Sequence, residues 1–99
     1  MESLKKRSTK KKIYKHSLSE SQIQSKYIKH LKTLHTDAFI VKLSDKWVSG
    51  LPDLLMVVGG KAYFYEIKSK NGVVSKIQEQ TMIALQKSGA IVNIVRGGE

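Results

Sequence analysis

The stretch GLPDLLMVVGGKAYFYEIK, residues 50–68, decides the fold of this chain. It contains two runs rich in β-branched and aromatic residues, 54–58 and 62–68, on either side of Gly59-Gly60. A pair of glycines between two such runs is typical of a two-residue hairpin loop, because the favoured loop needs positive φ angles. The stretch therefore predicts an antiparallel β-hairpin.

The predicted loop also sets the register of the hairpin. With Gly59-Gly60 as the loop, Val58 pairs with Lys61. Counting back along the ladder then places Asp53 opposite Glu66 on the same face, whereas a three-residue loop would send the two carboxylates to opposite faces. Directly opposed side chains have Cβ atoms about 5 Å apart, where like charges are destabilising unless a positive group lies between them. A divalent cation is the simplest such group.

The second strand of the hairpin carries Glu66-Ile67-Lys68, the only acid-x-Lys triplet in the sequence. Glu66 and Lys68 share a face, and Tyr63, Tyr65 and Ile67 point to the other. Apolar residues on both faces indicate a central strand, where charges are costly unless they are paired or bind metal. A salt bridge between Lys68 and one carboxylate is the alternative interpretation. The opposed carboxylates favour a metal site.

Oxygen ligands suit Mg²⁺ or Mn²⁺, and we expect the ligands to be Asp53, Glu66 and the backbone carbonyl of Ile67. Such an ion lowers the pKa of a bound water and stabilises charge that develops on a phosphate. Lys68 would orient that water or neutralise the same charge. Asp53, Glu66 and Lys68 together predict a site that hydrolyses phosphodiester bonds.

Two helices are predicted from capping boxes. Ser19 with Gln22 opens a helix over about 19–35, whose apolar side chains recur at helical spacing: Ile23, Tyr27, Leu31 and Leu34. Glu20 falls beside this apolar stripe, and an interaction with the helix dipole explains it without a role in chemistry.

The second capping box is Ser75 with Gln78, which opens a helix to about Ser88 before Gly89. Gln78 faces the sheet in this helix, so it can cap the helix and also reach the site. Two further strands are predicted over 38–43 and 90–95. The order is helix, three strands, helix, strand, which predicts an α/β fold with a mixed sheet flanked by helices.

The chain is strongly basic, with 18 Lys and Arg against 8 Asp and Glu and a formal charge of +10. Such a charge favours nucleic acid as partner. We expect residues 1–17 to form a disordered basic arm ahead of one domain, 18–99, and the arm either grips phosphates or is a solubilising tail. Its basic residues are Lys5, Lys6, Arg7, Lys10, Lys11, Lys12 and Lys15.

Three residues outside the arm join the candidate DNA-binding set: Lys46, Trp47 and Lys70. Trp47 either stacks on an unpaired base or packs over the end of the sheet. The chain has no cysteine, which excludes disulfides and thiolate zinc sites and fits a reducing compartment. Its apolar runs are too short to span a bilayer, so a cytoplasmic protein without a membrane partner is expected.

At residues 50–55, GLPDLL, and 66–68, EIK, the chain resembles the PD-(D/E)XK nuclease superfamily, and more closely its VRR-NUC (virus-type replication-repair nuclease) family. The resemblance covers about residues 18–96 and includes Ser19-Glu20, Ser75-x-x-Gln78, Leu85 and Gly89. It implies a restriction-endonuclease-like core. It also implies that Asp53 and Glu66 bind metal, that Lys68 is catalytic, and that Gln78 and Glu20 belong to the site, Glu20 as a ligand directly or through water.

Family domains of this size that stand alone resemble phage proteins, which would act in the cytoplasm of a host cell. The resemblance also implies a dimer whose action is related to that of Holliday-junction resolvases. We therefore expect a Mg²⁺- or Mn²⁺-dependent endonuclease acting on branched DNA, above all four-way junctions. In a homodimer, each protomer would cut one strand of a symmetric junction. The alternatives are a nuclease for flaps, ends or duplex DNA, and a basic DNA-binding module without catalysis.

Overall fold

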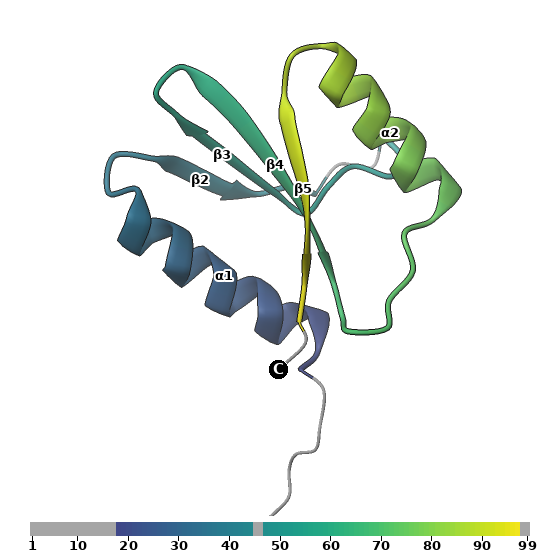
Figure 1. The fold of residues 1–99 in the computed structure, drawn as a ribbon, viewed down its shortest axis with the longest axis horizontal. Helices are drawn as coiled ribbons and strands as arrows, with labels where there is room; N and C mark the ends of the chain where they lie inside the picture. Colours follow the sequence, from purple (N-terminus) through teal and green to yellow (C-terminus); the bar gives the residue numbers. More distant parts are fainter. Residues whose placement is uncertain (1–17, 45–46, 98–99) are drawn as a thin grey trace, which may run out of the picture.

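The computed structural model describes residues 18–44 and 47–97, which form two helices and four strands (Figure 1). The α/β class and the order of elements confirm the prediction, and each boundary lies within one residue of the predicted one. In chain order the elements are α1 (Glu20–Leu34), β2 (Phe39–Lys42), β3 (Leu54–Val58), β4 (Lys61–Lys68), α2 (Lys76–Lys87) and β5 (Ile91–Arg96).

The four strands form one mixed sheet in the order β2-β3-β4-β5. β2 and β3 are antiparallel, β3 and β4 are antiparallel, and β4 and β5 are parallel. Val58 pairs with Lys61 and Leu54 with Tyr65, which is the register predicted from a two-residue loop. Gly59 and Gly60 have φ angles of 59° and 75°, the positive values that this kind of loop requires at both positions.

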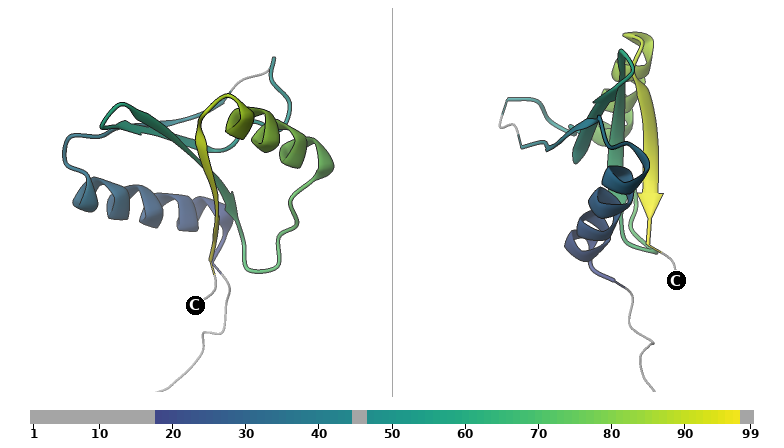
Figure 2. Two further views of the ribbon diagram at one scale, coloured as in Figure 1. Left: turned by 45° about the horizontal axis from the view of Figure 1, so that its top comes forward. Right: turned by 90° about the vertical axis from the view of Figure 1, so that its left-hand side faces the viewer.

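The two helices lie on opposite faces of the sheet (Figure 2). Alternate residues of β4 separate the faces, since Tyr65 and Ile67 pack with α1 whereas Glu66 is bonded to Gln78 of α2. The α1 side holds the main core, whose buried residues are Ile23, Leu31, Leu54, Met56, Tyr65 and Ile67. The charged residues of β4 therefore belong to the α2 face.

Helix α1 packs through most of the predicted apolar stripe. Ile23 and Leu31 are buried, and the Tyr27 ring contacts the Tyr65 ring edge-on at 5.2 Å between centroids. Leu34 was expected on the same stripe but is 60% exposed. It is the last residue of the helix, and the part of the stripe that packs on the sheet ends at Leu31.

Both predicted capping boxes are present. Ser19 accepts from the Gln22 amide and Ser75 from the Gln78 amide, and each glutamine side chain accepts from the capping residue's own N–H. These bonds satisfy amides that a helix start would otherwise leave unpaired. They also fix the first turn of each helix, where Glu20 and Gln78 lie.

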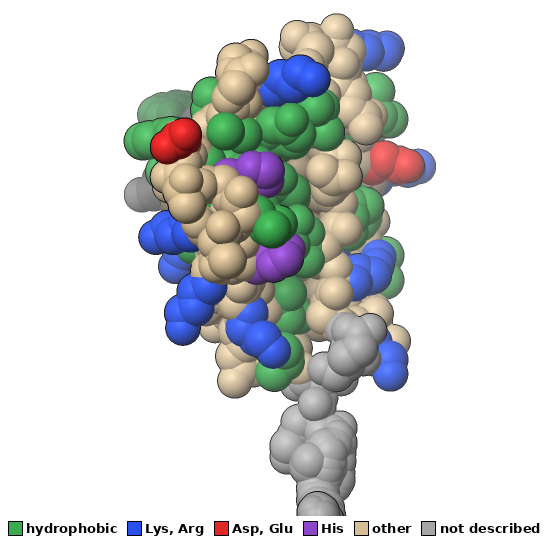
Figure 3. Space-filling model, turned by 60° about the vertical axis from the view of Figure 1, so that its left-hand side comes forward, with side chains coloured by type: hydrophobic (Ala, Val, Ile, Leu, Met, Phe, Trp, Pro, Cys, Tyr) green, Lys and Arg blue, Asp and Glu red, His purple; other side chains and the backbone are tan. Residues whose placement is uncertain are grey.

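The surface of the described residues is basic. Figure 3 shows one face of the molecule, on which Lys and Arg side chains lie around an apolar area and acidic side chains are few. Within residues 18–44 and 47–97, neither helix has the length and apolar character that a membrane span requires.

Candidate functional site

The candidate site lies at the open end of the hairpin, where β3 begins and β4 ends. The ladder ends at the pair formed by Leu54 and Tyr65, so the predicted pairing of Asp53 with Glu66 is not part of it. Asp53 directly precedes Leu54, and its negative charge acts on Glu66. The Asp53 N–H donates to the Tyr65 carbonyl over 3.0 Å, and the Asp53 carboxylate accepts from the Ile67 N–H over 2.8 Å. Asp53 is thus fixed to β4 through both its main chain and its side chain.

Glu66 is the most buried acidic group of the site, with 2% of its surface exposed. The Gln78 amide nitrogen donates to its Oε2 over 3.0 Å, while the Gln78 amide oxygen accepts from the Ser75 N–H over 2.9 Å. One side chain therefore caps α2 and holds the β4 carboxylate. The position of Gln78 in the Ser75-x-x-Gln78 pattern, on the helix face toward the sheet, predicts both contacts.

Lys68 shares the face of Glu66 and is 9% exposed. Its ammonium group lies 3.7 Å from Glu66 Oε2, so the salt bridge weighed from the sequence is present. It does not satisfy the whole carboxylate, because Oε1 is buried and has no hydrogen-bond partner among the described residues. A buried acceptor without a partner is costly, and a bound cation at Oε1 would remove that cost.

The pKa of Glu66 also indicates that its negative charge is poorly compensated in the metal-free protein. Burial, and then the negative charge of Asp53, raise the pKa of Glu66 from 4.5 to about 7, against the lowering effect of Lys68 and with a smaller raising effect of Glu20. Two nearby carboxylates thus impede the ionisation of a buried third group. A divalent cation is the kind of charge that would offset this.

Ile67 lies between the charged residues with its side chain in the α1 core, 1% exposed. Its N–H points toward Asp53, to which it donates. In a strand of a sheet the N–H and C=O of one residue project toward the same neighbour, so its carbonyl lies on the Asp53 side as well. Together with the two carboxylates, this carbonyl would provide an oxygen-only donor set of the kind that Mg²⁺ and Mn²⁺ prefer.

Glu20 reaches the site from α1, on the opposite face from α2, and its side chain is exposed. Its carboxylate accepts from the Ser69 N–H over 3.4 Å, directly after Lys68 in the chain. No group of three or more His, Cys, Asp and Glu side chains forms a metal cluster in the described part of the chain. Glu20 is therefore a neighbour of the carboxylate pair rather than a third side chain packed against it.

The predicted DNA-binding residues are only partly within the described structure. Trp47 is 93% exposed, which disagrees with the alternative that it packs over the sheet end. Lys70 is exposed in the turn after β4. Lys46 lies outside the described residues, as do the predicted arm, 1–17, and its basic side chains Lys5, Lys6, Arg7, Lys10, Lys11, Lys12 and Lys15.

Two residues near the site were missed in the sequence analysis. Arg96 pairs with Lys68 in the parallel ladder, and its guanidinium donates to the carbonyls of Ser69 and Gly72 in the turn after β4. The Thr81 hydroxyl donates to the Ser49 carbonyl over 2.7 Å. Knowledge of the register between β4 and β5 would have placed Arg96 beside Lys68. No local sequence pattern indicates which residue of β5 pairs with which residue of β4.

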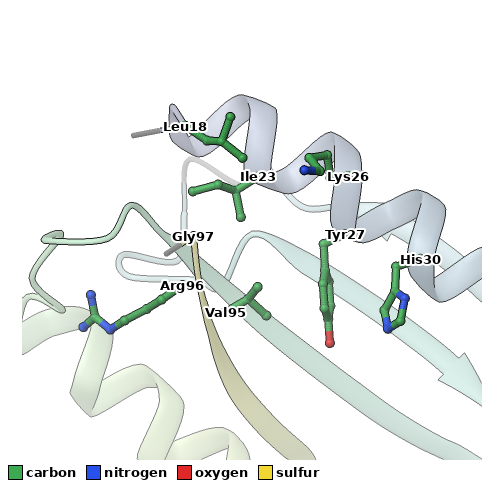
Figure 4. A pocket seen from close by; sticks show the side chains of 8 residues that line it. All are labelled: Leu18, Ile23, Lys26, Tyr27, His30, Val95, Arg96 and Gly97. Carbon is green, nitrogen blue, oxygen red and sulfur yellow. The ribbon is translucent and has the colours of Figure 1, made fainter. Parts of the chain in front are cut away.

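A hollow of about 310 Å³ lies between α1 and the end of β5, lined by Leu18, Ile23, Lys26, Tyr27, His30, Val95, Arg96 and Gly97. Figure 4 shows that the Arg96 guanidinium points away from it. The hollow is mainly apolar and lies on the α1 side, whereas Glu66 and Lys68 are on the α2 face of β4. It is therefore separate from the candidate site.

The raised pKa of Glu66 predicts how the metal-free protein responds to pH. Because the folded state binds a proton that the unfolded state releases, stability should fall as pH rises from about 4.5 to about 7, by up to about 3 kcal/mol. Urea unfolding in EDTA across this range measures it, with Glu66→Gln as control. The wild type should lose stability relative to Glu66→Gln, and parallel pH profiles would contradict the assigned burial and charges.

Comparisons with known proteins agree with this arrangement. A family model described as "VRR-NUC domain" matches residues 2–99. A solved structure described as "VRR_NUC domain" is 30% identical, covers 80% of this chain and 84% of its own, and superposes with a TM-score of 0.67. No curated protein matches the chain. The chain belongs to the VRR-NUC family of nuclease domains.

Proposed function

We propose that this chain is a Mg²⁺- or Mn²⁺-dependent endonuclease that hydrolyses phosphodiester bonds in branched DNA. The observation that carries the proposal is the pair of neighbouring carboxylates, Asp53 and Glu66, with a buried Glu66 oxygen that lacks a hydrogen-bond partner among the described residues. Lys68 stands beside them. Membership of a nuclease family supports the reaction class.

The residues present fit a divalent metal. Asp53, Glu66 and the Ile67 carbonyl would hold the ion, and Glu20 would act through a water. When bound, the ion would lower the pKa of a water molecule that it holds and would place positive charge next to the phosphate. The donor set contains no sulfur or imidazole, which favours these hard cations over zinc.

The protein's own groups then have separate tasks. Gln78 and the Ile67 N–H hold the two carboxylates in fixed orientations, so little reorganisation is needed when the substrate binds. The Lys68 ammonium neutralises negative charge that develops on the phosphate oxygens in the transition state. Its buried position excludes much of the water that would screen this charge.

Branched DNA is the proposed substrate, with four-way junctions foremost. The charge of +10 supports a polyanionic partner, and exposed Trp47 and Lys70 offer base stacking and a phosphate contact. A homodimer would place two such sites about a two-fold axis, which matches the symmetry of a four-way junction. A single small domain gains stability from the same association.

Cleavage assays test the reaction and its substrate together. With Mn²⁺, the wild type should cut a four-way junction faster than a flap or linear duplex of equal length. Lys68→Ala should lower the rate by at least about 100-fold and change the Kd for DNA less than about 3-fold, because the lysine acts mainly in the transition state.

Lys87→Ala, at an exposed lysine at the end of α2, is the matched control for the loss of one positive charge. A flap or duplex preference would replace the junction assignment with the alternative nuclease activities. Absence of cleavage on every substrate with Mn²⁺ or Mg²⁺ would leave the non-catalytic DNA-binding module.

The basic arm is proposed to bind phosphates. It contains seven Lys and Arg within residues 1–16. Deleting residues 1–16 should therefore weaken duplex binding and flatten the plot of log K against log salt, by a slope of up to about 6. Fluorescence anisotropy at several salt concentrations measures both effects. An unchanged slope would assign the arm to solubility.

A further inference from the structure

Helix α2 is bonded to β4 and to the segment that precedes β3, the two parts of the chain that carry the candidate carboxylates. On the β4 side, Gln78 donates to Glu66. On the β3 side, Thr81 donates to the carbonyl of Ser49, four residues before Asp53. Gln78 and Thr81 are three positions apart, so they lie on the same face of the helix in successive turns.

The second attachment includes a close backbone contact as well as a hydrogen bond. Gly50 has a φ angle of +74°, and a Cβ at this position would lie 2.6 Å from the Ile77 carbonyl oxygen and 2.9 Å from the Gln78 amide nitrogen. Only glycine adopts this conformation and permits this approach without strain. The segment before Asp53 is thus held against the first turn of α2.

Little freedom remains between this attachment and Asp53. Only Leu51 and Pro52 separate Gly50 from the aspartate, and Pro52 has a fixed φ and is among the most buried side chains. Asp53 itself is bonded to β4 twice, through its backbone N–H to Tyr65 and through its carboxylate to the Ile67 N–H. A shift at Ser49 is therefore transmitted to the start of β3.

We propose that Thr81 is a positioning residue of the nuclease site, which sets the placement of Asp53 relative to Glu66 by holding the 49–52 segment on α2. The inference rests on the proposed function of the two carboxylates. One rigid helix then locates both of them, through Gln78 for Glu66 and through Thr81 for the segment leading to Asp53. Fixed supporting contacts of this kind tune metal affinity and rate without touching the substrate.

The test compares Thr81→Val, which keeps the shape and removes the hydroxyl, with Thr81→Ser, which keeps it. Thr33→Val is the matched control, since the Thr33 hydroxyl also donates to a backbone carbonyl, that of Lys29, within α1. For each variant we would measure kcat and KM for Mn²⁺-dependent cleavage, Mn²⁺ affinity by calorimetry without DNA, and the thermal unfolding midpoint.

Thr81→Val should lower kcat and Mn²⁺ affinity by about 10-fold each, with KM for DNA within about 2-fold of the wild type. Thr81→Ser and Thr33→Val should keep wild-type values. Gly50→Ala should act in the same direction as Thr81→Val and more strongly, because its Cβ would push the segment off α2. All variants should be tested below their unfolding midpoints.

Wild-type Mn²⁺ affinity and kcat in Thr81→Val would overturn the inference, and so would a loss of stability alone. The same holds if Thr81→Ser fails to restore both values. If the wild type cleaves no substrate, the proposed function fails, and Mn²⁺ calorimetry on Thr81→Val still decides whether this hydroxyl positions the carboxylates.

Discussion

The burial of Glu66 near the charge of Asp53 is the constraint on which the rest of the structure depends. A carboxylate with 2% exposure next to another carboxylate is unfavourable unless several groups compensate for it. Gln78 and Lys68 both approach one oxygen of Glu66, and the Ile67 N–H holds the carboxylate of Asp53. The other Glu66 oxygen has no hydrogen-bond partner among the described residues, and this is where the proposed cation would bind.

The arrangement around this pair follows from the hairpin. A two-residue loop at Gly59-Gly60 fixes the register, and the register brings the start of β3 beside the end of β4, where the charge of Asp53 acts on Glu66. β5 adds Arg96 beside Lys68 and ties down the turn that follows β4. The α1 face supplies the apolar core, so the α2 face of β4 can carry charge without weakening the main packing.

Features with a local signal were predictable from the sequence. The glycine pair predicted the register, and the two Ser-x-x-Gln patterns predicted both helix starts, because turns and capping boxes involve residues close in the chain. The exposure of Leu34 and the contact between Thr81 and Ser49 depend on where one element ends relative to the element that it packs against. The spacing of apolar residues along the sequence does not predict these tertiary contacts. Glu20 was predicted only in part: its place in the first turn of the helix was predicted, but its hydrogen bond with the Ser69 N–H was not.

The nuclease core and the choice of substrate rest on different parts of the chain. A fold of this class supports many specificities, and in the proposed function exposed groups such as Trp47 and Lys70, rather than the buried carboxylates, would select among DNA structures. The basic excess acts on all DNA alike through phosphate contacts. The proposed junction preference would therefore require geometry beyond charge, and the proposed two-fold arrangement of protomers would be the simplest source of it.

Anomalous X-ray diffraction from crystals grown with Mn²⁺ tests the central claim most directly. The account predicts a strong anomalous peak within coordination distance of Glu66 Oε1 and the Asp53 carboxylate, on the side of β4 where the Ile67 carbonyl projects, and its loss in crystals of Asp53→Asn. A fully hydrogen-bonded Glu66 with no peak beside it, or a manganese ion bound only elsewhere on the protein, would contradict the account.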